Sequence, residues 1–265
     1  MPYPIFDSHA HYTSVQFDED RAELLNSLPG EGVVGIIDCG THYGSSLKAV
    51  ELAHQYPFIW AAAGIHPESL IEEDATTVSR FGGDWKAEMA AMRDLYEDPR
   101  VVAVGEIGLD HHWPIPEDAQ FEMFEAQIRL ALELDKPIIV HDRQAHAEVY
   151  TLLKKYKPKG VLHCYSGSAD DAEWLVKQGM YIGFGGACTF KGAKRAVKAV
   201  KAMPLDRILL ETDCPYMAPE PCRGQRCDSG LIAHTGRFIA EVREMDAETL
   251  FTATAENARR LFLEK

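Results

Sequence analysis

Short apolar runs recur along this chain, each followed by a segment with helical spacing, and this rhythm restricts the fold more than any other feature. Eight such runs are present, at 4–6, 33–37, 58–63, 101–104, 137–140, 161–162, 180–184 and 208–210. Runs this short and this uniformly apolar are typical of strands buried on both faces of a parallel sheet. Strands that alternate with helices form βαβ units, which build either a closed barrel or an open doubly wound sheet.

Eight such units in 265 residues favour an α/β fold of the (β/α)8 barrel type over the open sheet. The glycine-rich dinucleotide fingerprint that would follow the first strand of an open sheet is absent. Two further helices, 231–244 and 247–263, close the chain, so we expect an extra C-terminal helix after the barrel. Because no second hydrophobic pattern or linker appears, residues 1–265 are expected to form a single domain.

The helix expected between the fourth and fifth strands has a clear amphipathic pattern. Within 117–134, apolar side chains recur at helical spacing at Phe121, Phe124, Ile128 and Leu132. Side chains three and four residues apart lie on one helical face, so we expect these four to face the sheet.

Metal-ligating residue types occupy the ends of the apolar runs. His9 and His11 follow the first run two residues apart, so their side chains point to the same side of a strand. Any one of these residues could equally be a hydrogen-bonded polar residue at a strand end. Chance does not readily explain six of them at the same structural position. The six candidate ligands are His9, His11, Glu106, His141, His163 and Asp213. In a barrel these positions lie on the C-terminal rim, where active sites occur.

Four imidazoles and two carboxylates are too many ligands for one catalytic ion that keeps an open position. They fit two divalent ions about 3.5–4 Å apart, which would lower the pKa of a shared water and hold the attacked centre. Glu106 is the candidate bridge, and Asp213 is placed to accept the water's proton as a general base. Asp7 lies deeper in the first strand and is expected to orient a histidine. Zinc, manganese, magnesium, iron and cobalt all suit such mixed nitrogen and oxygen ligation.

Three residues near these ligands are candidates for substrate binding. His66 ends the third run, where a turn residue is an equally good interpretation. Arg143 lies two residues after His141 and suits either a phosphate or carboxylate contact or a salt bridge at a helix start. Tyr165 opens a loop before a helix, where backbone N–H groups favour anions.

The formal charge of −14 argues against a passive basic patch as the source of any nucleic-acid binding, because an acidic surface repels phosphates. Bound divalent cations could invert the sign locally. Arg223 and Arg226, in a loop after the eighth strand, are the best candidates for basic contacts. Six scattered cysteines fit reduced thiols, so a cytoplasmic protein is expected. No signal peptide, membrane span or sign of an obligate protein partner is visible.

With these residues assembled, the sequence resembles the TatD family of metal-dependent hydrolases, within the amidohydrolase-like superfamily, over essentially the whole chain. The motifs that carry the resemblance lie at 7–11, 17–21, 64–67, 105–110, 137–141, 163–167, 211–216 and 256–258. Among them are Asp-Ser-His-Ala-His, Gly-Glu-Ile-Gly-Leu-Asp and Glu-Thr-Asp-Cys-Pro-Tyr. The resemblance implies a TIM barrel with a two-metal site and DNase or other phosphodiesterase activity, often described as 3′–5′ exonuclease.

The resemblance also implies how the ligands divide between the ions. His9, His11, Glu106 and Asp213 would hold one ion, and Glu106, His141 and His163 would hold the other.

Two departures from the family pattern stand out. The family commonly carries Leu-Asp after the His-x-His motif, where this chain has Tyr12-Thr13. The family's Arg-Asn-Glu-Pro after the eighth strand is here Arg226-Cys227-Asp228-Ser229. That loop borders the substrate side, so its divergence bears on the substrate and leaves the metal site intact.

The leading interpretation is a metal-dependent phosphodiesterase that acts on DNA or a nucleotide-like diester, with a water activated between two ions. An alternative is an amidohydrolase that cleaves a C–N or ester bond of a small metabolite with the same ions. Such relatives often bridge their ions with a carboxylated lysine, whereas the fourth run here ends in Glu106, which favours the phosphodiesterase. A non-enzymatic binding protein is a third possibility, and ligands at each expected strand end argue against it.

Overall fold

Eight parallel strands form one sheet in chain order, as the sequence predicts. The computed structural model describes residues 3–71 and 80–264. The strands are β1 (Ile5–Ala10), β2 (Val33–Cys39), β3 (Ile59–Ala63), β4 (Val101–Asp110), β5 (Ile138–Arg143), β6 (Gly160–Leu162), β7 (Met180–Phe184) and β8 (Ile208–Leu210). Each strand neighbours the next, from β1 to β8, and the pairs β3–β4, β4–β5, β5–β6 and β7–β8 are parallel.

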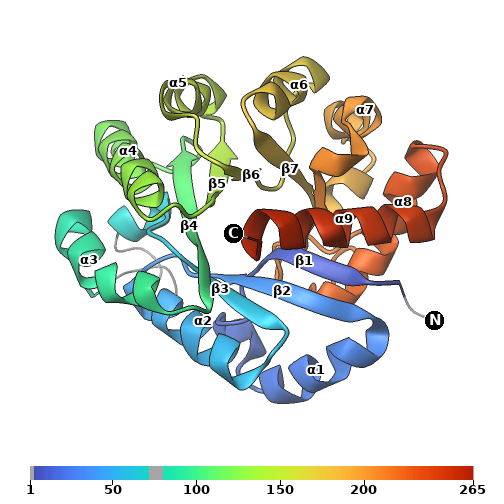
Figure 1. Cartoon of the computed structure of the whole chain (residues 1–265), viewed down its shortest axis with the longest axis horizontal. Coiled ribbons are helices and arrows are strands. Elements are labelled where there is room, and N and C mark those ends of the chain that lie inside the picture. The colour runs from blue at the N-terminus through green and yellow to red at the C-terminus, as the bar shows by residue number, and fades with distance from the viewer. Residues whose placement is uncertain (1–2, 72–79, 265) are drawn as a thin grey trace. The chain divides into compact units, whose positions relative to one another are not determined.

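Helices alternate with these strands (Figure 1). They are α1 (Arg21–Ser27), α2 (Tyr43–Gln55), α3 (Trp85–Ala91), α4 (Glu117–Glu133), α5 (His146–Tyr156), α6 (Ala169–Lys177), α7 (Lys194–Ala202), α8 (Ile232–Val242) and α9 (Ala247–Phe262). The extra C-terminal helix expected from the sequence is α9. Among residues 3–71 and 80–264, no helix is both long enough and apolar enough to cross a bilayer.

The chain divides into two compact units. The first unit comprises Met1–Ile37 and His163–Lys265, and the second comprises Asp38–Leu162. The first therefore contains β1, β7 and β8, and the second contains β3 to β6. Each unit holds residues from several strand ends.

In the first unit, the last strand returns to the first. The hydroxyl of Ser8 donates to the carbonyl of Leu210 at 3.0 Å, and the amide of Asp213 donates to the carbonyl of His9 at 3.0 Å. An isolated parallel bridge joins Ala10 to Cys214. The sheet that runs from β1 to β8 thus closes on itself, and the (β/α)8 barrel expected from the sequence is confirmed.

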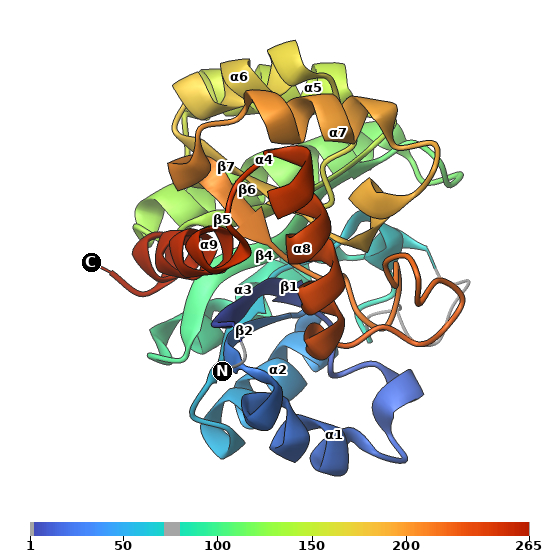
Figure 2. The same ribbon diagram turned by 90° about the vertical axis from the view of Figure 1, so that its right-hand side faces the viewer.

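Helix α9 covers the junction of β1 and β8 and lies beside α8 (Figures 1 and 2). The side-chain amide of Asn257, in α9, donates to the carbonyls of Leu205 and Ile208 at 2.8 and 2.9 Å. Asn257 is buried, so these bonds replace contacts with water and fix the helix to the start of β8.

In the second unit, β4 and β5 stay paired beyond the apolar runs that predicted them. Gly108 pairs with His141, and Asp110 pairs with Arg143. The amide of His111 then donates to the carbonyl of Arg143 at 2.9 Å. The two strands therefore extend as a ribbon past the point where the sequence pattern ends.

The face of α4 differs in part from the expectation. Phe124 and Ile128 are fully buried, as expected, but Phe121 is half-buried and Leu132 is 46% exposed. Ala131 completes the buried face instead. A helix advances by about 100° per residue, which turns residue 132 away from the sheet once Phe124 and Ile128 face it.

The close approach of β3 and β4 generates a stability prediction. A Cβ added to Gly64 would lie 2.6 Å from the carbonyl carbon of Gly105 and 2.9 Å from the carbonyl oxygen of Glu106. Backbone atoms cannot rotate away, so Gly64→Ala should lower the free energy of unfolding by about 1–3 kcal/mol. Urea unfolding followed by circular dichroism measures this loss. Gly30→Ala is the control, because nothing lies within 4 Å of that Cβ. Equal losses in both variants would contradict the packing argument.

Candidate metal centre

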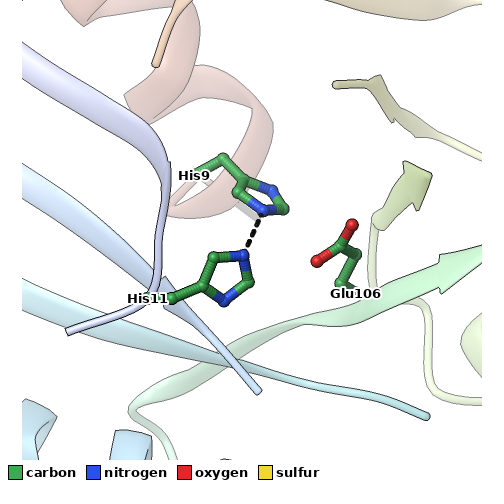
Figure 3. Close-up of side chains that lie close together, drawn as sticks. All are labelled: His9, His11 and Glu106. Atoms are coloured by element: carbon green, nitrogen blue, oxygen red, sulfur yellow. Dashed lines mark hydrogen bonds between the residues drawn. The ribbon is translucent and has the colours of Figure 1, made fainter. Parts of the chain in front are cut away.

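Four of the six predicted ligands lie together in the first unit, and these residues form the first cluster: His9, His11, His163 and Asp213. The Nε2 atoms of His9 and His11 are 3.0 Å apart, and Figure 3 shows the two rings meeting through them. Asp213 Oδ1 lies 3.3 Å from His11 Nε2 and 3.6 Å from His9 Nε2. The ring of His163 stacks on that of His9, with centroids 3.9 Å apart.

The backbone after β8 aims the Asp213 carboxylate at the histidines. Asp213 has a φ of 60°, in the left-handed region that aspartate tolerates better than most residues. Burial alone would raise the pKa of Asp213, but the hydrogen bond with His11 and the nearby His9 hold that pKa below its usual value. The ionised carboxylate is the form that ligates a metal or accepts a proton.

Three residues of the second unit form the second cluster: His66, Glu106 and His141. Glu106 Oε1 lies 3.0 Å from His141 Nδ1 and 3.6 Å from His66 Nε2. The rings of His66 and His141 meet edge to face, with centroids 4.4 Å apart. Glu106 is only 3% exposed, so its carboxylate meets both imidazoles in a setting largely shielded from water.

Two hydrogen bonds give the histidines of the second cluster different roles. His66 Nδ1 accepts the amide of Glu68 at 3.2 Å, so Nε2 is the nitrogen that carries a proton, and it lies 3.6 Å from Glu106 Oε1. His141 Nε2 instead lies 2.9 Å from Asp110 Oδ2 and turns Nδ1 toward Glu106. Burial alone would lower the pKa of His141, but the bonds to Asp110 and Glu106 raise that pKa to about 10. A carboxylate behind an imidazole is the arrangement that orients metal-ligating histidines.

Both clusters have the donor types and spacings of divalent-metal coordination. Bonds of about 2.0–2.2 Å to nitrogen and oxygen put adjacent ligands of one ion about 3.0–3.5 Å apart. The contacts of His11 with His9 and with Asp213 fit this range at 3.0 and 3.3 Å, and His9 lies just beyond it from Asp213, at 3.6 Å. Glu106 and His141 fit it with a contact of 3.0 Å. The residues present therefore suit a divalent cation.

Comparison with known proteins identifies the family. A profile of the family described as TatD related DNase matches residues 6–263. The chain belongs to this family. YabD of Bacillus subtilis, described as an uncharacterized metal-dependent hydrolase, is 40% identical over 262 residues, 97% of this chain and 98% of that protein. The 3′-5′ ssDNA/RNA exonuclease TatD of Erwinia tasmaniensis is 35% identical over 270 residues, 97% of this chain and 99% of that protein.

Solved structures agree with this assignment. The crystal structure of YJJV, a TatD homolog from Escherichia coli K12, matches with a TM-score of 0.88 and 29% identity, over 99% of both chains. A TatD family hydrolase from Entamoeba histolytica matches in fold, with a TM-score of 0.84 at 18% identity. The TatD resemblance, the barrel and the metal-dependent hydrolase class expected from the sequence are confirmed.

In this TatD-family chain, a buried carboxylate holds β1 against the end of β8. Asp7 Oδ1 accepts the amides of His9 and Thr212 at 3.2 and 3.1 Å. Asp7 Oδ2 accepts the hydroxyls of Thr212 and Ser229 at 2.7 Å each. Burial outweighs these bonds and raises the pKa of Asp7 to about 6. Asp7 therefore acts on His9 through the backbone and not through the imidazole ring.

The two departures from the TatD pattern contact each other. The hydroxyls of Tyr12 and Ser229 are 2.8 Å apart, and the amide of Ser229 donates to the Tyr12 oxygen at 2.9 Å. Both residues are fully buried. Leucine and proline at these positions would lack the hydroxyls and the amide N–H. The changes therefore form one polar contact between the chain after β1 and the loop after β8.

That loop is also held from outside, by its arginines. Arg226 donates to both carboxylate oxygens of Asp20, at 2.8 and 2.5 Å, and its guanidinium lies 4.7 Å from the ring centroid of Phe17. Arg223 lies 4.2 Å from the ring centroid of Phe190. The carboxylate of Asp20 thus neutralises Arg226, which the sequence offered as a basic contact.

The predicted substrate-binding residues lie in different environments. His66 belongs to the second cluster. Tyr165 is 5% exposed and donates its hydroxyl to the carbonyl of Ser168 at 2.6 Å. Arg143 is exposed, with its guanidinium 5.7 Å from the ring centroid of Trp113. The structure therefore groups His66 with the ligands and buries most of Tyr165, and the substrate roles stay predictions.

Glu211 lies beside the first cluster, although the sequence did not predict it as a ligand. Its Oε1 accepts the amide of Cys164 at 2.5 Å and lies 3.8 Å from His163 Nδ1. Burial raises the pKa of Glu211 to about 8. Gly183 makes room for it, because a Cβ there would collide with Glu211 Oε2. The available signal was a second carboxylate two residues before Asp213, directly after the same apolar run.

Two buried glutamines of α4 fix the backbone that carries the second cluster. The side chain of Gln127 accepts the Ile65 amide at 2.8 Å and donates to the Ile65 carbonyl at 2.9 Å. The side chain of Gln120 likewise accepts the Asp110 amide at 2.8 Å and donates to the Asp110 carbonyl at 2.9 Å. The helical periodicity of apolar residues does not predict these two contacts. The feature of the sequence that points to them is the pair of glutamines seven residues apart on the apolar face.

The Gln127 contact predicts a large stability loss. Gln127→Met keeps the volume but leaves the amide and carbonyl of Ile65 buried without these partners, at about 1–3 kcal/mol each. The free energy of unfolding in urea should fall by about 2–4 kcal/mol. Gln55→Met, at an exposed position of α2, should change it by less than about 0.5 kcal/mol. A small loss at Gln127 would show that the backbone finds other partners.

The Asp110–His141 contact predicts an effect on metal affinity. Asp110→Asn replaces the charged acceptor behind His141 and should weaken the binding of a divalent cation by about 10–100-fold. Calorimetric titration of the metal-free protein with Zn²⁺ or Mn²⁺ measures the change. Asp118→Asn, at an exposed position in the first turn of α4, should keep the wild-type affinity. Equal affinities in the two variants would remove Asp110 from the metal centre.

Proposed function

We propose that this chain is a two-metal phosphodiesterase that degrades single-stranded nucleic acid from the 3′ end. The observation that carries the proposal is the pair of clusters, each with nitrogen and oxygen donors within barrel strands or just after them. Support comes from a TatD relative that is named a 3′-5′ ssDNA/RNA exonuclease and is 35% identical along 97% of this chain. The match to residues 6–263 supports a single functional domain over 1–265.

The ligand division that we propose is the one that the TatD resemblance implies. The carboxyl ends of all strands of a closed parallel barrel lie on one rim, so the two clusters would serve one centre. His9, His11, Glu106 and Asp213 would hold one ion, and Glu106, His141 and His163 would hold the other. The stacking of His163 on His9 supports a position beside both ions.

The residues of this chain would then divide the work as follows. Bound divalent ions supply Lewis acidity and acidify a water. The Asp213 carboxylate, kept ionised by His11 and His9, accepts the proton of that water. His66 offers its Nε2–H, and Arg143 its guanidinium, to the phosphate oxygens. Asp110 holds His141 in one orientation throughout.

The test combines metal analysis with a substrate panel. Purified protein should contain divalent metal and should cleave single-stranded DNA or RNA and small phosphodiesters, but not amides. Treatment with a chelator should remove the activity, and the divalent ion should restore it. Turnover of amides without turnover of phosphodiesters would establish the amidohydrolase alternative instead.

Glu106→Ala tests the centre itself. Because changes behind a ligand already cost about 10–100-fold, loss of the Glu106 carboxylate, which would serve both ions, should cost more than about 100-fold in turnover and should lower the bound metal per chain. Glu122→Ala, at an exposed position of α4, is the matched control and should retain both. Metal-dependent activity that survives in the Glu106 variant would show that the ligand assignment is wrong.

A further inference from the structure

Trp113, in the segment between β4 and α4, is exposed to solvent. Trp113 is 46% exposed, although a neighbour in the same turn, Ile115, is 4% exposed. The guanidinium of Arg143 lies over the ring at 5.7 Å from its centroid. The ring of His112 meets the indole edge to face, with centroids 4.8 Å apart. An indole and a guanidinium are therefore displayed together at the ends of β4 and β5.

Hydrogen bonds fix the turn that carries Trp113, so the exposure of the indole is a property of the folded turn. The amide of His112 donates to Asp110 Oδ1 at 2.8 Å, and the amide of Ile115 donates to the carbonyl of Trp113 at 2.8 Å. The side chain of Gln120 donates to the carbonyl of Ile115 at 3.2 Å. Hydrogen bonds on both sides of Trp113 fix the backbone. Burial of Ile115 anchors the turn, so the turn does not need burial of the indole.

The turn that carries the indole is linked to the second cluster through Asp110. Asp110 bonds the amide of His112 with one oxygen and His141 with the other. Arg143 lies two residues beyond His141 on β5, on the same side of the strand and about 6.6 Å further along it. One extended strand of nucleic acid can therefore contact the second cluster and the Trp113–Arg143 pair together.

We propose that Trp113 and Arg143 form a nucleotide subsite for single-stranded nucleic acid, in which the indole stacks on one base and the guanidinium binds the adjoining phosphate. This proposal rests on the proposed function and adds a contact outside the metal centre. Stacking needs a base face that is free of its neighbours, so the occupant is an unpaired strand and not a duplex. Stacking on the indole tolerates all four bases, and the phosphate is the same at every nucleotide, so the subsite selects for single strands without reading sequence.

Equilibrium binding of the full-length, metal-loaded protein to fluorescently labelled oligothymidylate tests the subsite. Trp113→Ala should weaken binding about 5- to 100-fold, and Trp113→Phe should recover most of the loss. Arg143→Ala should also weaken binding and should reduce the slope of log affinity against log salt by about 0.7. Tyr156→Ala is the matched control, because Arg129 lies over that ring at 5.6 Å at the other end of α5. It should bind like the wild type.

A series of oligonucleotides with one abasic position locates the stacked base. The wild type should lose affinity at one position, and Trp113→Ala should show no loss at that position. Equal effects of abasic sites in both proteins, or unchanged binding by Trp113→Ala, would overturn the subsite. Cleavage of methyl p-nitrophenyl phosphate, which has no base, reports separately on the proposed function. Wild-type protein that binds the oligonucleotide through Trp113 but cleaves neither substrate would refute the activity and keep the subsite.

Discussion

The hydrogen bonds of Asp7 are the constraint on which the first cluster depends. Its two oxygens accept four donors, from β1, from Thr212 and from Ser229. A buried carboxylate is costly unless such donors replace its water, so carboxylate and donors hold one another in a single arrangement. His9 provides one donor, and Thr212 adjoins Asp213. The positions of His9 and Asp213 in the first cluster thus follow from the backbone that Asp7 fixes.

The second cluster depends on the same principle with different groups. Gln127 and Gln120 are neutral, and each satisfies both backbone groups of one residue, Ile65 or Asp110. Each clamped residue lies next to, or hydrogen-bonds, a histidine of the cluster. Burying an amide costs less than burying a charge, and a glutamine offers a donor and an acceptor at once. The clamp therefore fixes a strand end without placing another negative charge near Glu106.

The sequence predicted what depends on residue type and spacing. Alternating apolar runs predicted the eight strands, and ligand types at their ends predicted six of the seven residues in the two clusters. The seventh, His66, was predicted as a substrate contact. Hydrogen bonds between residues that only the fold brings together could not be predicted from the sequence. The Asp110–His141 contact needs the register of β4 on β5, and the Tyr12–Ser229 contact joins residues 217 positions apart. The exposure of Leu132 also depended on the phase of α4 against the sheet, which apolar spacing alone left open.

Charge limits where the proposed nucleic-acid substrate could bind on this TatD-family chain. The net charge is −14, and several arginines already bond carboxylates: Arg226 to Asp20, and Arg93 to Glu133. Long-range attraction of a polyanion is therefore weak, and screening by salt cannot be the main control of affinity. What remains are the proposed local contacts, namely divalent cations held by the clusters, the guanidinium of Arg143 and stacking on Trp113. Such contacts act only within a few nucleotides of the centre, which suits an enzyme that works at the end of a strand.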